Sequence, residues 1–438
     1  GRHEKRVGLD RHVGGELTVP GDKSISHRSL MLGSIAEGQT HVTGFLASED
    51  CLATMAAMKA MGVQIERPTP TELRVQGVGM RGLRAAGKPL DLGNSGTAIR
   101  LMTGLLAGQS FDSELIGDAS LMTRPMERVA KPLRLMGARI DTRDGKPPVR
   151  IHGGQPLKGI HYDLPVASAQ VKSAIMLAGL YADGATTVVE PGVTRDHTER
   201  MLLTFGCRVD AARGRISVTP PSRLEASSLE VPADFSSSAF FIVAGLLAAK
   251  DLLVVRGVGI NPTRTGLLDI LGLMGADLRL VNHRSAGAEP VADIEIRPSR
   301  LKGIHVPEGL VALAIDEFPA FFIAAACADG ETVVTGAEEL RVKESDRLAA
   351  MANGLAALGV EAEVLPDGMR LRGQPDGRPF SGGTIDSHGD HRIAMSFAMA
   401  SVRARGEIRI LDVANVATSF PGFVEVSRAA GLAVVPAP

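Results

Sequence analysis

Hydrophobic and polar positions recur along this chain in six copies of one pattern. Each copy opens with polar residues and continues into a stretch rich in Ala, Leu, Met or Phe. A short β-like run such as THVTGF or TTVVE follows, then a polar loop and a second helical stretch. The six openings lie at Lys23, Gly93, Ser168, Ser236, Asp316 and Gly389. The pattern predicts a β-α-β-α-β-β unit that is repeated six times.

The second helical stretch of each copy ends in an apolar residue followed by Gly, which is typical of a helix C-terminus. The spacings between these glycines are 75, 69, 69, 84 and 72 residues, and one sixth of 438 is 73. Generic α/β composition does not produce such regularity, and solenoid repeats are shorter, at about 20 to 50 residues. We therefore expect an α/β (α+β) protein with two globular domains of three units each. The glycines are at positions 62, 137, 206, 275, 359 and 431.

Two proline-containing steps mark the expected domain boundaries. Pro20-Gly21 precedes the first unit and Val231-Pro232 precedes the fourth. We predict that domain I contains residues 1–20 plus 232–438 and that domain II contains residues 21–231. The N-terminal strand ELTVP then belongs with the C-terminal half, and two chain crossings form a hinge beside an active-site cleft. The polar opening GRHEKR is expected to be a trimmed end.

Composition excludes several classes of protein. With 44% hydrophobic and 22% charged residues the chain is neither fibrous nor disordered, and three distant cysteines form no disulfide framework or CxxC pattern. A net charge of -1 and 3% aromatic residues argue against a nucleic-acid partner. No uninterrupted apolar run of membrane-spanning length and no signal peptide is apparent. We expect a cytoplasmic protein with no membrane partner.

Several expected helices carry cations in their first turns. Positive charge there opposes the helix dipole, so a bound anion or a carboxylate partner is needed to offset it. The free N–H groups at the same place bind anions. The Ser, Asn and Asp residues of these openings, such as Asn94 and Ser168, are also ordinary N-cap residues, and that alternative stays open for each. The cations are Lys23, Arg28, Arg100 and Arg392.

The polar loops before the second helices add Arg124, Arg195 and the run RVKESDR. Such a run is usually a solvated helix face, but Lys343 and Arg347 stand at i and i+4 and repel each other unless an anion lies between them. Arg binds phosphate and carboxylate bidentately, so the predicted ligand is small and carries several of these groups. No P-loop, strand-linked GxGxxG or metal-ligand cluster occurs, and we expect no cofactor and no metal.

These residues identify a family resemblance. From about residue 15 to the C-terminus the chain resembles the 5-enolpyruvylshikimate-3-phosphate (EPSP) synthases, also called 3-phosphoshikimate 1-carboxyvinyltransferases. SAQVK, TRDHT and NPTR are similar to the class II branch, which includes glyphosate-tolerant bacterial enzymes. The motifs that carry the resemblance are GDKSISHR, LDLGNSGTAIRL, RPMERV, SAQVKSA, DEFP, RVKESDR, GDHRIAM and TSFPGF.

The resemblance implies the two-domain enolpyruvyl transferase fold and transfer of the enolpyruvyl group from phosphoenolpyruvate to the 5-hydroxyl of shikimate 3-phosphate. Phosphate is released through a tetrahedral intermediate, in the shikimate pathway to chorismate and the aromatic amino acids. By the same resemblance, shikimate 3-phosphate is held by Lys23, Ser24, Arg28, Ser168, Ala169, Gln170, Arg195, Asp316 and Lys343. Phosphoenolpyruvate is held by Lys23, Asn94, Gly96, Arg124, Gln170, Arg347 and Arg392.

The reaction needs two proton carriers, one at the 5-hydroxyl and one at the methylene carbon. We expect Asp316 to be the base at the hydroxyl, Glu344 to be the acid and base at the methylene, Lys23 to stabilise charge and His391 to assist. Neighbouring cations should lower the pKa of Glu344, which makes its role as an acid the weaker assignment. A plain salt bridge for Glu344 and an orienting role for His391 stay open.

One position departs from the family pattern, and one bears on inhibition. Many members have Lys in the last loop where this chain has Thr418, so that phosphoenolpyruvate contact is missing or supplied elsewhere. A side chain at position 96 is one route by which class II members exclude glyphosate, and this chain keeps Gly96. We expect appreciable glyphosate inhibition.

Two rival functions stay open. The related UDP-N-acetylglucosamine enolpyruvyl transferase usually carries a reactive Cys before its Arg-Pro, where this chain has Asp118-Ala119-Ser120. A noncatalytic anion-binding relative would bind the substrates without turning them over.

We expect the protein to be a monomer.

Overall fold

The computed structural model describes residues 4–7 and 12–436, and they divide into two compact units. Unit 2 contains Gly21–Val231 and Ala286–Glu289, and unit 1 contains the remainder of the chain. The divisions after Pro20 and Val231 fall where the sequence analysis places them. Residues 1–3, 8–11 and 437–438 of predicted domain I lie outside the described residues.

Ala286–Glu289 differs from the sequence-based division, which places these residues in domain I. The structure groups them with unit 2 because two of them hydrogen-bond to the helix that begins at His197. Glu289 Oε1 lies 2.7 Å from His197 Nδ1, and the Ala288 carbonyl accepts a 2.8 Å hydrogen bond from Arg200. No local sequence signal indicates that residues 286–289 belong to unit 2.

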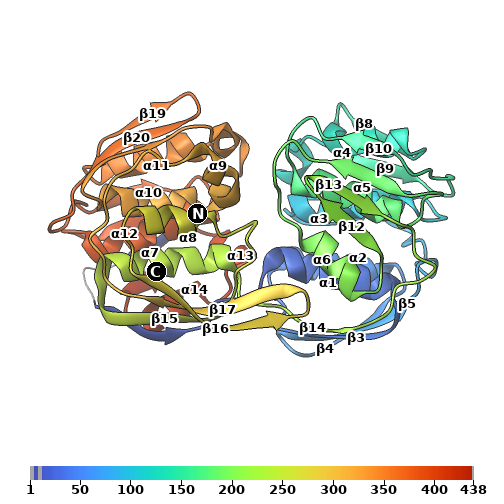
Figure 1. The fold of residues 1–438 in the computed structure, drawn as a ribbon, viewed down its shortest axis with the longest axis horizontal. Coiled ribbons are helices and arrows are strands. Elements are labelled where there is room, and N and C mark those ends of the chain that lie inside the picture. Colours follow the sequence, from blue (N-terminus) through green and yellow to red (C-terminus); the bar gives the residue numbers. More distant parts are fainter. Residues whose placement is uncertain (1–3, 8–11, 437–438) are drawn as a thin grey trace. The chain divides into compact units, whose positions relative to one another are not determined.

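Unit 2 contains three sheets, each of which has the β-α-β-α-β-β order (Figure 1). Its helices are α1 (Lys23–Ile35), α2 (Glu49–Ala60), α3 (Gly96–Ala107), α4 (Glu127–Leu135), α5 (Ala169–Gly179) and α6 (His197–Thr204), with a 3-10 turn at Leu121–Thr123. Its strands are β3 (Glu37–Thr43), β4 (Gln64–Thr69), β5 (Glu72–Val78), β6 (Leu90–Asp91), β7 (Ser113–Ile116), β8 (Arg139–Arg143), β9 (Lys146–His152), β10 (His161–Asp163), β11 (Thr186–Val189), β12 (Val209–Ala212), β13 (Arg215–Val218) and β14 (Ser228–Glu230).

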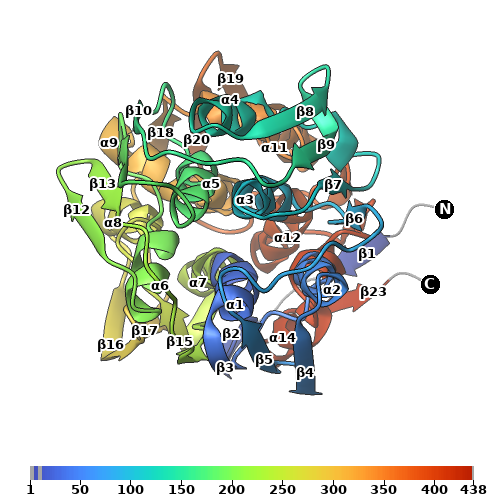
Figure 2. The same cartoon turned by 90° about the vertical axis from the view of Figure 1, so that its right-hand side faces the viewer.

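The three sheets of unit 2 have the orders β14-β3-β5-β4, β6-β7-β9-β8 and β10-β11-β13-β12. In each, the first two strands are parallel and the last two form an antiparallel hairpin. In the second and third sheets a helix crosses between the two parallel strands. The first sheet takes its parallel strand β14 from the end of the unit. Helices α1, α3 and α5 lie at the centre of the unit with the sheets around them (Figure 2).

Unit 1 follows the same plan, except that its sheet β18-β20-β19 has three strands, with isolated parallel bridges where a first strand would lie. Its helices are α7 (Phe235–Ala248), α8 (Gly266–Leu273), α9 (Glu308–Val311), α10 (Phe318–Ala326), α11 (Arg347–Ala357), α12 (His391–Ala400), α13 (Val416–Ser419) and α14 (Phe423–Ala429), with 3-10 segments at Ala312–Glu317, Glu338–Val342 and Ser401–Arg403. Its strands are β1 (Glu4–Val7), β2 (Val13–Leu17), β15 (Ala249–Gly259), β16 (Leu278–Ala286), β17 (Glu289–Ile296), β18 (Gly330–Val334), β19 (Ala362–Leu365), β20 (Gly368–Gly373), β21 (Gly383–Asp386), β22 (Ile408–Leu411) and β23 (Val434–Pro436).

The N-terminal segment completes two sheets of unit 1. Strand β2 pairs in parallel with β15, in the half of the chain where the sequence analysis expects this segment. Strand β1 lies between β22 and β23, so part of the polar opening GRHEKR forms a central strand, which the sequence analysis did not expect.

The six glycines that end the second helices adopt positive φ angles, from 82° at Gly359 to 108° at Gly137. This left-handed conformation stops a helix and is nearly free of strain only for Gly. A β-strand begins within a few residues of each glycine. The spacing seen in the sequence is therefore the spacing of these helix ends, and the predicted sixfold unit is confirmed.

The core of unit 1 is built around α7, α10 and α12, whose side chains are nearly all buried. Glu308–Ala326, which spans α9 to α10, is the one helical stretch among the described residues that is long and apolar enough to cross a membrane. Asp316 and Glu317 interrupt it, and 67% of it is buried inside the protein. It is therefore a core helix of unit 1.

Helix α11 packs closely on α12 at Gly354. A Cβ atom at this position would lie 2.3 Å from the ring of Phe397, which is fully buried. Gly272 in α8 of the same unit is the opposite case, since a Cβ there would meet no atom within 4 Å. Replacing Gly354 with Ala therefore tests the close packing of two helices, whereas replacing Gly272 with Ala tests helix propensity alone.

We expect Gly354→Ala to lower the free energy of unfolding by about 1–3 kcal/mol, because the added methyl overpacks the α11–α12 contact. Gly272→Ala should leave stability unchanged or raise it by up to about 1 kcal/mol. Urea unfolding of both variants measures the difference. Equal stability of the two variants would contradict the close contact.

Candidate active site

The first helices of unit 2 begin with side-chain caps. Asp22 accepts a hydrogen bond from the Ile25 N–H at 2.8 Å, and Ser95 does the same for α3. Ser168 accepts from the Val171 N–H at 3.3 Å, so the N-cap role that the sequence left open for Ser168 is observed. Ala169 is the first residue of α5. These caps fix how each helix starts and leave the neighbouring N–H groups available to an anion.

Lys23, the first residue of α1, lies beside a carboxylate. Its Nζ is 2.7 Å from Asp50 Oδ2, and the Lys23 side chain is 31% exposed. A cation at a helix N-terminus requires such a partner, because it otherwise opposes the dipole. Asp50 is contributed by α2, and the sequence analysis did not assign it a role.

Arg28 is buried one turn below Ser24. Its guanidinium donates to Thr198 Oγ1 at 2.7 Å, to the Ser24 carbonyl at 2.9 Å and to Ser173 Oγ at 3.1 Å. Burial lowers the pKa of Arg28 to about 10, and the charge of Arg195 acts in the same direction. Arg28 therefore ties the starts of α1, α5 and α6 together, with Arg195 close by.

The starts of α3 and α5 are joined by Gln170. Its Oε1 accepts from Arg100 at 2.7 Å and its amide donates to Thr97 at 3.2 Å. A Cβ at Gly96 would lie 3.1 Å from an Arg100 nitrogen and 3.7 Å from an Arg124 nitrogen, so both guanidinium groups approach this glycine.

The loop before α4 also reaches this cluster. Asn94 donates its amide to the carboxylate of Asp118 at 2.9 and 3.0 Å. In unit 2 the structure thus brings together most of the predicted residues at the starts of four helices. We call these residues the unit 2 cluster: Lys23, Ser24, Arg28, Asn94, Gly96, Arg124, Ser168, Ala169, Gln170 and Arg195.

In unit 1 the predicted residues gather around Arg347, which is 1% exposed. The guanidinium lies 2.9 Å from Asp390, 2.6 Å from Glu344 and 3.6 Å from Asp316. Asp390 also caps α12 through the Arg392 N–H at 3.0 Å. One buried cation therefore holds three carboxylates from three separate segments.

Lys343 extends this group, with its Nζ 3.8 Å from Asp316. The expected i,i+4 arrangement of Lys343 and Arg347 on one helix face is wrong, because Lys343 lies in extended backbone before α11 and Arg347 is the first residue of that helix. Asp316 lies near both cations. We call the residues Asp316, Lys343, Glu344, Arg347, Asp390, His391 and Arg392 the unit 1 cluster.

The charges of this cluster set the protonation of its acid–base groups. Burial would raise the pKa of Glu344, but the positive charge of Arg347 holds it well below its ordinary range, and His391 and Arg392 act in the same direction. Burial and the charge of Arg392 lower the pKa of His391 to about 4. At neutral pH Glu344 is therefore a carboxylate and His391 a neutral imidazole.

Thr418, where many family members have Lys, is in α13. Its hydroxyl donates to the Asn415 carbonyl at 2.7 Å, and Asn415 in turn donates to the Gly389 carbonyl at 2.8 Å. The Thr418 side chain thus hydrogen-bonds within its own helical turn, and it has no positive charge of the kind that a lysine would supply.

Sequence reasoning missed the carboxylates that hold these cations. Asp50 is 27 residues from Lys23, and Asp390 is 43 residues from Arg347. Asp390 lies inside the motif GDHRIAM, and its place before a cationic helix start was the one available signal. Ser173 and Thr198 lie inside the quoted motifs SAQVKSA and TRDHT, but nothing in the motifs shows that these hydroxyl groups support a buried Arg.

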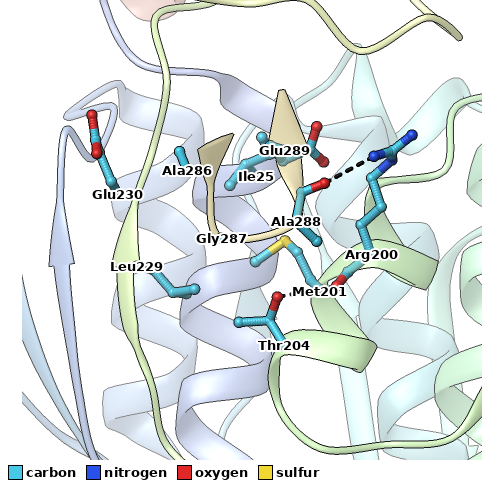
Figure 3. Close-up of a pocket in the computed structure, with 10 residues that line it drawn as sticks. All are labelled: Ile25, Arg200, Met201, Thr204, Leu229, Glu230, Ala286, Gly287, Ala288 and Glu289. Carbon is cyan, nitrogen blue, oxygen red and sulfur yellow. Dashed lines mark hydrogen bonds between the residues drawn. The ribbon is translucent and has the colours of Figure 1, made fainter. Parts of the chain in front are cut away.

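A surface pocket of about 280 Å³ lies beside Ala286–Glu289 (Figure 3). Figure 3 shows the hydrogen bond from Arg200 to Ala288 at its edge. Its lining contains none of the predicted substrate-binding residues. This pocket therefore contributes nothing to the proposed chemistry.

Solved structures match the architecture over its whole length. An EPSP synthase structure from Acinetobacter baumannii has a TM-score of 0.92 and 54% sequence identity and covers 100% of both chains, and a second structure from the same organism has a TM-score of 0.91. The fold and the two clusters define a transferase of the enolpyruvyl class.

Sequence comparisons place the chain within that class. The family model described as EPSP synthase (3-phosphoshikimate 1-carboxyvinyltransferase) matches residues 9–426. A 3-phosphoshikimate 1-carboxyvinyltransferase from Methylococcus capsulatus is 59% identical over 98% of this chain and 99% of the relative. One from Alkalilimnicola ehrlichii is also 59% identical, over 96% and 94%. The chain belongs to the EPSP synthase family, and carboxyvinyl transfer in the shikimate pathway is the activity of that family.

We expect Arg347→Gln to lower the free energy of unfolding at pH 7 by about 3–5 kcal/mol, because it leaves the fully buried carboxylate of Asp390 without its cation. Arg347 holds the pKa values of Glu344 and Asp390 below their ordinary range. Their contribution is complete above the unfolded pKa values, near 4, and is lost as the pH falls through the folded values. The difference from the wild type should therefore begin to narrow as the pH falls below about 5, and it should keep narrowing below pH 3.

Arg300→Gln is the matched control, because Arg300 is 56% exposed and pairs with Asp376 on the surface. We expect it to change stability by at most about 1 kcal/mol. Thermal unfolding across this pH range measures both variants. A pH-independent loss for Arg347→Gln would show that the carboxylates do not depend on it.

Proposed function

We propose that the two clusters bind phosphoenolpyruvate and shikimate 3-phosphate and that their residues have the roles expected from the family motifs. The observation that carries this proposal is the placement of the predicted cations at helix N-termini and beside carboxylates in both units. Two phosphates and two carboxylates enter the reaction, and guanidinium groups with helix N–H groups suit both. An active site in a cleft between the domains stays a prediction.

The lowered pKa of Glu344 shapes the proposed proton transfers. Addition requires that the methylene carbon gain a proton while the 5-hydroxyl loses one to Asp316, and elimination removes a methyl proton as phosphate leaves. An anionic substrate that engages Arg347 and Arg392 offsets the charges that lower the pKa of Glu344. Binding then raises this pKa, so that Glu344 first donates a proton and later takes one back.

Lys23 and His391 have supporting roles in this proposal. Lys23 stabilises negative charge on the substrates from the start of α1. A neutral His391 orients groups near Glu344 by hydrogen bonding, which is the alternative that the sequence left open. Its low pKa argues against a cationic acid.

The acceptor in this proposal is shikimate 3-phosphate and not UDP-N-acetylglucosamine. In the loop before Arg124, Asp118 binds Asn94 and accepts from the Leu121 N–H at 2.8 Å, so a carboxylate organises the loop. Cys51, Cys207 and Cys327 are buried, and none lies in this loop. We also propose a cytoplasmic monomer that glyphosate inhibits.

Phosphate release from phosphoenolpyruvate tests the reaction directly. We expect release that depends on shikimate 3-phosphate, and a fall of at least about a hundredfold in kcat for Glu344→Gln, which is typical of the loss of general acid–base catalysis. Glu339→Gln is the control, because Glu339 is an exposed carboxylate on the preceding 3-10 segment and should retain wild-type activity.

Each other outcome has a definite meaning. Release with UDP-N-acetylglucosamine alone would assign the chain to the related transferase. No phosphate release with either acceptor would mean that the protein binds the substrates without catalysing the reaction. Full activity of Glu344→Gln would contradict the role of this carboxylate.

Glyphosate should compete with phosphoenolpyruvate in the wild type. A methyl group at Gly96 would meet the ends of two flexible Arg side chains and no backbone, so Gly96→Ala should fold. We expect its glyphosate inhibition constant to rise by at least about tenfold, the usual effect of one added methyl in a tight site. Absence of competition in the wild type at millimolar glyphosate would overturn this expectation.

A further inference from the structure

A buried charge cluster in unit 2 has no role in the reaction described above. Lys172 of α5 is 0% exposed, and its Nζ lies 2.8 Å from Glu190 and 2.9 Å from Glu199. The two glutamate side chains are 6% and 8% exposed. Charges removed from water in this way are stable only when they are paired in good geometry. We call Lys172, Glu190 and Glu199 the buried triad.

Each member of the buried triad is on a segment that carries a residue of the unit 2 cluster. Lys172 is two residues after Gln170, at the start of α5. Glu190 follows β11, at the head of the loop that carries Arg195, and accepts a hydrogen bond from Thr194 in that loop. Glu199 is in the first turn of α6.

The buried triad also lies next to the two hydroxyl groups that accept hydrogen bonds from Arg28. Ser173 follows Lys172 in the chain and Thr198 precedes Glu199, so the ion pair between α5 and α6 fixes the turns that carry both hydroxyls. Ser173 Oγ and Thr198 Oγ1 are 2.7 Å apart, and each accepts from Arg28. The charge of Glu199 also raises the pKa of Arg28, which indicates electrostatic contact between the triad and this Arg.

We infer that the buried triad is a positioning element for shikimate 3-phosphate binding: it locks the starts of α5 and α6 and the loop 190–196 so that Gln170, Arg195 and Arg28 are held ready for the ligand. The inference rests on the proposed function, since it concerns the site of the same substrate. The triad lies below the unit 2 cluster and takes no part in proton transfer. Its effect is therefore on substrate affinity and not on the chemical step.

The test compares two Michaelis constants in the full-length enzyme. We expect Lys172→Met to raise KM for shikimate 3-phosphate by about tenfold, the effect of losing roughly one well-placed polar contact. KM for phosphoenolpyruvate should rise clearly less, because Gln170 is the only one of these three positioned residues that is also assigned to that substrate, and kcat should change by less than about threefold. Lys158→Met is the control, because Lys158 is an exposed lysine of the same unit and should leave both constants unchanged.

Further variants separate positioning from stability. Lys172→Met leaves the buried carboxylates of Glu190 and Glu199 without a cation, which lowers stability. The triple variant Lys172→Met/Glu190→Gln/Glu199→Gln removes all three charges and should therefore recover stability. The triple variant should fold, as measured by circular dichroism melting, and still show the raised KM for shikimate 3-phosphate. Glu199→Gln alone keeps an acceptor for Lys172 and should show a smaller rise for the same substrate.

Three outcomes would overturn the inference. These are a wild-type KM for shikimate 3-phosphate in the folded variants, an equal rise for both substrates, or failure of every variant to fold. A wild-type enzyme that does not use shikimate 3-phosphate would instead refute the proposed function. Wild-type activity with shikimate 3-phosphate therefore tests the proposed function, and the comparison of the variants with the Lys158→Met control tests the positioning role.

Discussion

The N-terminus of a helix leaves backbone N–H groups without partners inside the helix, and this requirement shapes both clusters. Asp22, Ser95, Ser168 and Asp390 each satisfy part of it with a side chain. The N–H groups that remain, together with adjacent cations, form a positive environment without any large net charge on the protein. The six-unit fold repeats such helix starts, and most of the predicted anion-binding residues lie at or near them.

Much of the fold follows from the sequence because its signals are local. The left-handed glycines, the apolar helices and the strand after each glycine all depend on residues close together in the chain. Predicted positions such as Lys23 and Gln170 therefore fall at the expected helix starts.

The partners of these residues do not follow from the sequence, because tertiary structure alone brings them together. Asp50 and Asp390 come from distant helices, and the buried triad joins three segments. The excursion of Ala286–Glu289 into unit 2 depends on His197 and Arg200, which are nearly a hundred residues away. Strand β1 was missed because its sequence is polar and its partners β22 and β23 lie at the other end of the chain.

Buried ion pairs recur in both units, with different consequences. Around Arg347 the neighbouring cations hold the pKa of Glu344, the proposed proton carrier, well below its ordinary range. The charges of the buried triad are shielded from solvent, and the role that we infer for them is positioning. Buried ion pairs are thus proposed to serve reactivity in unit 1 and rigidity in unit 2.

Strands β1, β2 and β14 complete sheets whose other strands lie far away in the sequence, and this orders events during synthesis. The first sheet of unit 2 cannot close until residues 228–230 have emerged from the ribosome. Strand β1 pairs with β22 and β23, which are translated about 400 residues later. Unit 2 can thus finish folding while the ribosome is still translating unit 1, whereas unit 1 keeps an unpaired N-terminal segment until nearly the whole chain exists.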